Sequence, residues 1–395
     1  MFGKIKRYIL VTLVNLQNMT EILHFAGFIS GVKYRACLTA KLEKVDLERF
    51  DVNRSSVYGI TQADEAEIAY SKWVLPKRTR SYPFARIYNI YNASKILTII
   101  PVIKDEGKDG DLDKLQYSTI SWMNLLNIYI VLGYYEDAER SQKKGQANKN
   151  KLTNQKFNNE FVKSQIQEIL DYKQSALHWN KNLFEERFVR IFRQVLDAYK
   201  IISNRTGAQI HSQAGMEKYL QAVIGDFEEF KNLSLRGSQG ASRREAITSH
   251  ELEYLVDGMK ATFAIENYLG GTYYLTPDEI LHREERYVIQ ESKNSTKSTL
   301  LELSDIQDGL FKLILYSNID SLQLNGLQVL FATRLKLTGK NIRDRIVLPC
   351  SLKAIESFLE KNSTVLSNKE QSIVKKLLLE TQRNNNIEIE IRANN

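Results

Sequence analysis

The hydrophobic pattern of this chain changes its period twice, and this change constrains the fold more than any other feature. Short apolar runs in the first 150 residues, such as 96–103, are typical of strands. From about residue 158 the apolar residues recur at helical spacing, as in 188–199 and 216–227. Strand-like runs return from about residue 262. The pattern therefore predicts an α/β protein with a helical middle region.

The chain is long enough for more than one core. It has 395 residues, and a domain takes roughly 150 residues. A polar stretch at 141–155 is typical of a loop or linker, and so is a Gly/Ser/Arg stretch at 235–244. We expect four parts: an N-terminal α/β lobe (1–150), a helical region (151–235), a mixed-sheet core (236–330) and a C-terminal helical or mixed segment (331–395).

Several helix starts can be predicted from capping residues. Ser304 and Gln307 have the spacing of a capping box, in which a hydroxyl and an amide satisfy the first backbone N–H groups. Ser367 and Glu370 have the same spacing. A further helix is expected after Ser351.

Charge and cysteine content narrow the partners and the compartment. The net charge of +8 favours a polyanionic partner, because each neutralised phosphate releases counterions. Cys37 and Cys350 are too few and too distant for a disulfide framework or a zinc knuckle, so a reducing cytoplasm is expected. No run approaches the roughly 20 apolar residues that span a bilayer, so no membrane partner is expected.

The stretch 270–295 carries the pattern with the most specific chemistry. Asp278 is followed, after a polar turn, by Glu291 and Lys293. This spacing suits one β-hairpin, and strand alternation places Glu291 and Lys293 on one face, with Gln290 on the other. Two carboxylates are what Mg²⁺ needs from a protein when phosphates and waters complete its shell. A lysine beside them can stabilise the charge that develops during phosphodiester hydrolysis.

An acid-x-lysine triplet alone is a weak signal, and the chain has four of them. Those that begin at Asp171 and Glu229 lie in helical stretches, where residues two apart point to different sides. Glu106-Gly-Lys108 is the competitor, because it follows a strand-like run, but residues 71–104 contain no acidic partner. Only Glu291 has a strand, the spacing and an upstream acid together.

This region resembles the catalytic core of the PD-(D/E)XK nuclease superfamily, and within it type II restriction endonucleases. The resemblance covers roughly residues 262–318 and implies a mixed-sheet core with flanking helices. It implies a Mg²⁺-dependent deoxyribonuclease with Asp278, Glu291 and Lys293 as catalytic residues, of which Asp278 and Glu291 bind the metal. Glu266 is the candidate for the assisting upstream acid that some members have.

Two basic segments are candidates for contact with double-stranded DNA. The first interleaves cations with aromatic residues, and the second is the Gly/Ser/Arg stretch. Their cations are Lys77, Arg78, Arg80 and Arg86 in the first, and Arg236, Arg243 and Arg244 in the second. A packed amphipathic loop and a solvated loop are the alternatives.

The acidic stretch from Asp105 to Asp113 could be a second metal site. An EF-hand loop that starts at Asp109 would need a glutamate at its twelfth position, where the chain has Ile120. The EF-hand is therefore rejected, and a solvated acidic turn and a metal site of another kind stay open.

The expected function is that of a sequence-specific type II restriction enzyme. Cutting both strands with one active site per chain would favour a homodimer. Non-specific, repair or phage-defence nucleases are alternatives with the same chemistry. A catalytically silent nucleic-acid-binding protein is the alternative from another class.

Overall fold

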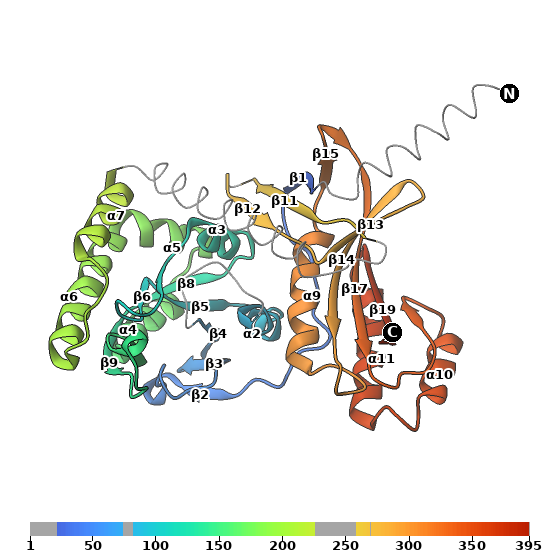
Figure 1. Ribbon diagram of the computed structural model, residues 1–395, viewed down its shortest axis with the longest axis horizontal. Coiled ribbons are helices and arrows are strands. Elements are labelled where there is room, and N and C mark those ends of the chain that lie inside the picture. The colour runs from blue at the N-terminus through green and yellow to red at the C-terminus, as the bar shows by residue number, and fades with distance from the viewer. Residues whose placement is uncertain (1–21, 74–81, 226–257, 269, 395) are drawn as a thin grey trace. The chain divides into compact units, whose positions relative to one another are not determined.

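The computed structural model describes residues 22–73, 82–225, 258–268 and 270–394 (Figure 1). They form two compact units, each built from segments that are far apart in the sequence. Unit 1 takes in the described residues of 1–30, 237–301 and 312–395, and unit 2 those of 31–236 and 302–311. Both units mix helices with sheets, so the predicted α/β class is confirmed.

One sheet of unit 1 joins the N-terminal strand to strands more than 200 residues later. Its order is β12–β11–β1–β15–β16. Strand β1 runs parallel to β11, with Leu23 opposite Ala261, and antiparallel to β15. The bounds are β1 Leu23–Ile29, β11 Ala261–Asn267, β12 Thr272–Leu275, β15 Ser321–Leu324 and β16 Leu327–Gln328.

The second sheet of unit 1 carries the predicted hairpin. Its order is β13–β14–β17–β19–β18, with parallel pairs β14/β17 and β17/β19 and antiparallel pairs at both edges. Helix α9 follows the hairpin and precedes β17 (Figure 1). The bounds are β13 Glu279–Arg283, β14 Arg286–Asn294, α9 Leu303–Ser317, β17 Leu330–Gly339, β18 Ile346–Leu348, α10 Leu352–Lys361, α11 Asn368–Arg383 and β19 Ile387–Ala393.

Unit 2 has its own five-stranded sheet of order β2–β3–β4–β5–β8. Strands β5 and β8 are buried at every position, as expected for parallel strands that are covered on both faces. The bounds are β2 Lys44–Asp46, β3 Tyr58–Ala63, β4 Ala66–Lys72, α2 Tyr82–Ile90, β5 Ile96–Pro101, α3 Tyr117–Leu125 and β8 Tyr129–Gly133.

The described residues of unit 2 also form two short ribbons and the helices α4, α5, α6 and α7. The ribbons pair β6 with β7 and β9 with β10. The helices include the one predicted from the apolar stripe at 188–199, which runs on to a left-handed Gly207. The bounds are β6 Ile103–Asp105, β7 Leu112–Lys114, β9 Tyr135–Arg140, β10 Leu152–Phe157, α4 Asn159–Asp171, α5 Ala176–Asn182, α6 Phe188–Thr206 and α7 Gln213–Gly225.

One order of elements occurs twice along the chain. Each time, a hairpin with a two-residue turn is followed by a helix and by a strand parallel to the hairpin's second strand. The first turn residue has a positive φ in both, 52° at Asp64 and 53° at Glu284. Counted from the turn, the position of Glu291 corresponds to Ser71, so the shared topology does not by itself supply a carboxylate there.

One local prediction was wrong, one was partly right and two were right. Residues 141–151 form a loop with a short 3₁₀ turn, as expected, but strand β10 takes up residues 152–155 of the predicted linker 141–155 and pairs with β9. Helix α9 begins before Ser304, and the Gln307 amide donates to Asn89 instead of capping the helix. Ser351 caps α10, and Ser367 with Glu370 forms a capping box on α11.

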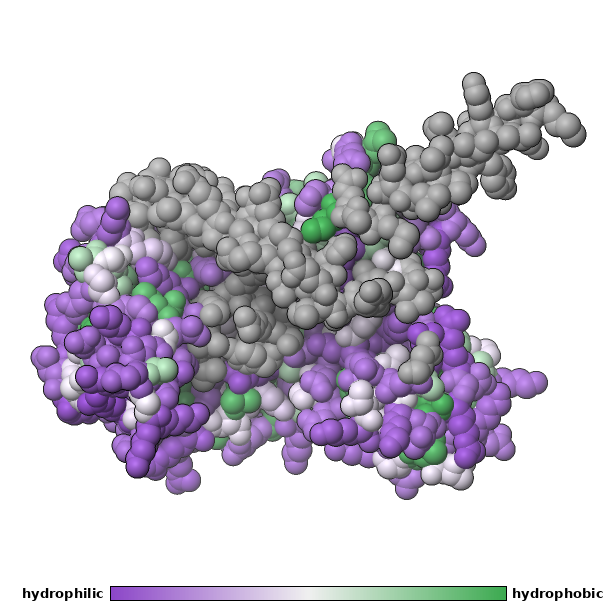
Figure 2. Space-filling view, in the orientation of Figure 1, coloured by the Kyte–Doolittle hydropathy of each residue, from purple (hydrophilic) through white to green (hydrophobic). Residues whose placement is uncertain are grey.

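None of the helices in the described ranges has the length and apolar character that crossing a bilayer requires. Hydrophilic residues cover most of the described surface on the face in Figure 2, with scattered hydrophobic ones. The stretches 1–21 and 235–244 lie outside the described residues.

Candidate functional site

The hairpin of unit 1 brings the first two predicted site residues opposite each other. Glu279 pairs with Gln290 across β13 and β14, so Asp278 and Glu291 are the next facing positions. The Ser292 backbone N–H donates to Asp278 Oδ2 at 2.7 Å, and the Lys260 ammonium donates to the Asp278 carbonyl at 2.8 Å. Asp278 is thus fixed from two sides.

The face on which each side chain lies follows from the strand register. Glu291 and Lys293 are in register with Leu335 and Leu337 of β17, both fully buried. Gln290 lies on the opposite face, where its amide donates to Glu279. The alternation predicted for β14 is therefore confirmed, and it directs Glu291 into an apolar layer while Lys293 stays half-buried.

Glu291 is a carboxylate that is 0% exposed and only partly satisfied. Its Oε2 accepts from the Lys312 ammonium of α9 at 2.6 Å. Its Oε1 has no hydrogen-bond partner among the described residues. A buried oxygen of a charged group without a hydrogen bond destabilises the folded state, and no described residue supplies a partner for Glu291 Oε1.

The pKa of Glu291 also indicates that the negative charge at this site is not fully balanced. Burial and the negative charge of Asp278 raise the pKa of Glu291 to about 8, although Lys312 and Lys293 lower it. The positive charges of Lys312 and Lys293 therefore do not fully offset the burial of Glu291 and the negative charge of Asp278. A bound cation would relieve both the repulsion and the missing contact of Glu291 Oε1.

A two-carboxylate magnesium site fits these residues. Mg²⁺ keeps several waters and is held by one or two carboxylates together with substrate phosphates. Across the described ranges, no three or more His, Cys, Asp and Glu side chains gather where they could hold a metal ion. A richer all-protein site is thus not found there, whereas Asp278 and Glu291 satisfy the smaller requirement of magnesium.

Glu266 is not brought onto this hairpin. It lies in β11 of the other sheet of unit 1, opposite Thr272, with an exposed side chain. Its position gives no support to a role as an assisting acid.

Only one of the predicted DNA-binding cations is described. Arg86 lies in α2 of unit 2, and its guanidinium donates to the carbonyl of Lys72. It therefore stabilises the packing of its own unit. The other candidates, Lys77, Arg78, Arg80, Arg236, Arg243 and Arg244, lie outside the described residues.

The competing acidic stretch uses its carboxylates within unit 2. Asp105 is 0% exposed and accepts from the backbone N–H of Gly107 at 2.8 Å and of His211 at 3.0 Å. His211 Nδ1 lies 2.7 Å from the same carboxylate. Asp109 Oδ2 accepts from the Asn150 backbone N–H at 2.7 Å. Through these contacts, Asp105 and Asp109 stabilise the fold of the loop.

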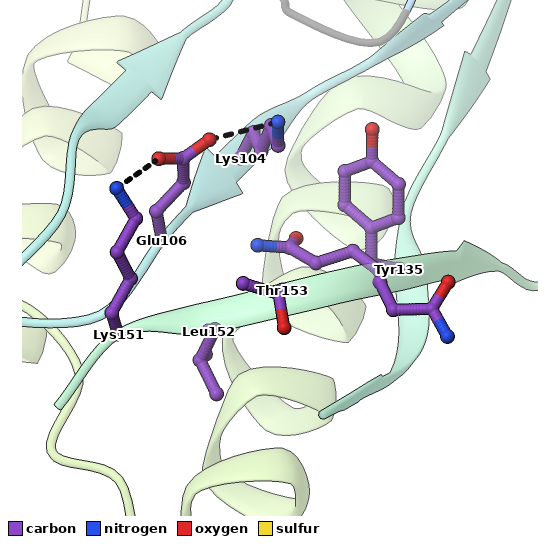
Figure 3. Close-up of a pocket in the computed structure, with 8 residues that line it drawn as sticks. Lys104, Glu106, Tyr135, Lys151, Leu152 and Thr153 are labelled. Atoms are coloured by element: carbon purple, nitrogen blue, oxygen red, sulfur yellow. Dashed lines mark ion pairs between the residues drawn. The ribbon is translucent and has the colours of Figure 1, made fainter. Parts of the chain in front are cut away.

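Glu106 lies at the edge of a cavity of about 340 Å³ (Figure 3). Lys104 Nζ is 2.9 Å from Glu106 Oε1, and Lys151 Nζ is 3.8 Å from Oε2 (Figure 3). Each oxygen of this carboxylate therefore has a cation close by. That balance is unlike the one at Glu291, where one oxygen has no partner in the part of the chain that the structure describes.

Lys312 is the site residue that the sequence reasoning missed. It lies in α9, the next described element after the hairpin and 21 positions from Glu291, so the acid-x-lysine motif does not contain it. A signal was present, since Lys312 is the only charged residue in the stretch 309–317. A lone lysine in an apolar helical stretch often pairs with a buried acid.

The chain was compared with family models, with curated proteins and with solved structures, and none of the three comparisons gave a match.

Proposed function

We propose that this chain is a Mg²⁺-dependent deoxyribonuclease of the PD-(D/E)XK type, with Asp278, Glu291 and Lys293 as its catalytic residues. The observation that carries the proposal is the convergence at the hairpin. Asp278 faces Glu291, Lys293 shares the face of Glu291, and Glu291 Oε1 has no partner among the described residues.

The surrounding topology supports this proposal. The superfamily core, as inferred from the resemblance, has an aspartate strand, a glutamate-x-lysine strand and a following helix. Here Asp278 directly precedes β13, β14 carries Glu291 and Lys293, and α9 follows. A parallel strand, β17, then pairs with β14. Such a βαβ arrangement holds Glu291 on a rigid element, which preorganised catalysis needs.

The proposed roles follow from the chemistry of each side chain. Bound Mg²⁺ polarises a phosphoryl oxygen and lowers the pKa of a water. Asp278 and Glu291 hold it, and Asp278 is fixed for this task by Ser292 and Lys260. Lys293 stabilises the negative charge that develops on the phosphate and orients the attacking water. Asp278 and Lys293 are both half-buried, so each side chain is partly accessible to a phosphate.

The biological setting that we propose is type II restriction by a homodimer in the cytoplasm. One active site cuts one strand, so a symmetric double-strand cut needs two copies of the chain. The net charge of +8 favours a DNA partner, and Lys77, Arg78, Arg80, Arg236, Arg243 and Arg244 are proposed to contribute phosphate contacts.

One observation favours a second candidate, a catalytically silent nucleic-acid-binding protein. Glu291 is fully buried and paired with Lys312, which is also the arrangement of a structural ion pair. In that case the hairpin would hold the fold together and bind no metal.

Incubation of a sequenced plasmid with the purified chain, with Mg²⁺ and with EDTA, distinguishes these functions. Discrete fragments with Mg²⁺ alone support the restriction enzyme, and a smear indicates a non-specific nuclease. Retarded but intact plasmid under both conditions supports the silent binding protein and rejects the nuclease. A supercoiled plasmid is suitable because nicking and linearisation are both visible on a gel.

A further inference from the structure

The contact between Lys312 and Glu291 has a geometry that bears on how the site takes up metal. Lys312 Nζ is 2.6 Å from Glu291 Oε2, and the two side chains are 20% and 0% exposed. The lysine comes from α9 and the acid from β14, so the contact also joins the helix to the sheet. It occupies one of the two oxygens that a metal could use.

We infer that Lys312 is an internal counter-cation that holds Glu291 before metal binds and that competes with a divalent cation for this carboxylate. The inference rests on the proposed function, because it assumes that Glu291 is a metal ligand. It assigns to Lys312 a positioning and regulatory role, distinct from the catalytic role of Lys293.

The physical basis is competition between two cations for one carboxylate. An ionised buried carboxylate without any partner is strongly unfavourable, so the ionised form of Glu291 needs a positive charge at this place when no metal is bound. Lys312 supplies it at Oε2, while Oε1 has no partner among the described residues. A divalent ion at Glu291 would stand close to the ammonium and repel it.

The lysine side chain is suited to such a displacement. Its ammonium is a compact charge on a flexible stem with four carbons, and part of the Lys312 side chain already reaches solvent. It can therefore leave Glu291 and regain hydration when metal arrives. The expected consequence is a metal affinity weaker than the two carboxylates alone would give.

The chain offers a matched control for this lysine. Lys361 Nζ lies 2.6 Å from Asp344 Oδ2 in the same unit, but these side chains are 55% and 49% exposed. The two pairs have the same length and differ in burial. Replacement of Lys361 should therefore leave the metal site unchanged.

The test is the affinity for Mg²⁺ alone, without DNA, measured by isothermal titration calorimetry at about pH 8.5. Wild type, Lys312→Met, Lys361→Met and Glu291→Gln are compared. We expect Lys312→Met to bind Mg²⁺ at least about tenfold more tightly than wild type, and Lys361→Met to bind as wild type does. A divalent ion gains more than a proton does from the loss of the ammonium, so proton competition does not cancel the effect.

Equal or weaker binding by Lys312→Met, with Glu291→Gln still impaired, would overturn this inference and leave the proposed function in place. Identical binding by wild type and Glu291→Gln would instead reject Glu291 as a ligand, and the proposed function and the inference would fail together.

A second variant keeps the test decisive if Lys312→Met does not fold. Lys312→Arg retains the charge and can hold the carboxylate with two N–H groups. We expect it to bind Mg²⁺ about threefold or more weakly than wild type. Binding as tight as that of wild type, or tighter, would contradict competition at Glu291.

Discussion

Replacement of Glu291 by glutamine should make the metal-free protein more stable, and the gain should grow with pH. Glutamine keeps the shape of the side chain and removes the buried charge. Lys312 loses the ion pair with Glu291, but its side chain is partly exposed and can be solvated. The remaining effect is the removal of a carboxylate. Burial and the negative charge of Asp278 raise the pKa of this carboxylate to about 8.

The sign and size follow from proton linkage. The unfolded chain releases the proton of Glu291 near the ordinary value of 4.5, whereas the folded chain holds it up to about pH 8. Between these values the folded state binds more protons, so its stability falls as pH rises. The slope is about 1.4 kcal/mol per pH unit, and over 8 − 4.5 = 3.5 units the upper bound is about 5 kcal/mol. Structural relaxation around Glu291 lowers this, and we expect about 2 to 5 kcal/mol.

Urea unfolding in EDTA at several pH values between about 5 and 8.5 measures the difference between Glu291→Gln and wild type. The variant should match wild type near pH 5 and exceed it increasingly toward pH 8. Glu285→Gln, an exposed residue in the turn of the same hairpin, serves as the control and should show no such trend. A difference that is independent of pH, or a variant that is less stable at pH 8, would refute the reasoning.

Three further predictions concern the other groups. Lys293→Met should lose most of the cleavage rate and keep Mg²⁺ binding, as measured by single-turnover cleavage and calorimetry; an unchanged rate would make this lysine structural. Asp105→Asn should lower the free energy of unfolding by about 2 to 4 kcal/mol, because it weakens a buried acceptor of three contacts. The cleavage rate per folded molecule should stay the same, and lost cleavage in folded protein would implicate the acidic loop. Removal of the charges at Lys77, Arg78 and Arg80 should flatten the plot of log affinity for DNA against log salt by about one unit per lost contact, and an unchanged slope would assign the segment to packing.

The parts of the fold that could be predicted are those that local sequence determines. The hairpin around residues 278–293 follows from alternation and a polar turn, and α6 follows from its apolar stripe. The capping box at Ser367 is equally local. Each of these depends on residues within about 20 positions of one another.

Long-range pairing could not be predicted in this way. Nothing in the segment 22–30 indicates that β1 will pair with β11, because its partners are more than 200 residues away. Strand β19 follows two helices and pairs with both β17 and β18 in the hairpin's sheet. The apolar residues of β19 alternate in the sequence, but nothing local to them identifies the sheet that the strand joins.

The candidate site likewise has a part that local sequence determines and a part that depends on tertiary packing. Asp278, Glu291 and Lys293 belong to one hairpin, so spacing alone brought them together. Lys312 reaches the site from α9 through tertiary packing, and the missing partner of Glu291 Oε1 is a property of that packing. Neither could be derived from strand periodicity.

The central claim is that the carboxylates of the hairpin, and not those of the acidic stretch, carry metal-dependent cleavage. The most direct test compares Glu291→Gln with Glu106→Gln on one plasmid with Mg²⁺, after circular dichroism has shown that both variants are folded. Glu106 is balanced by Lys104 and Lys151 near the surface, so its loss should leave substantial cleavage, whereas Glu291→Gln should show none. Cleavage that survives in Glu291→Gln and disappears in Glu106→Gln would place the catalytic centre in unit 2 and contradict the account.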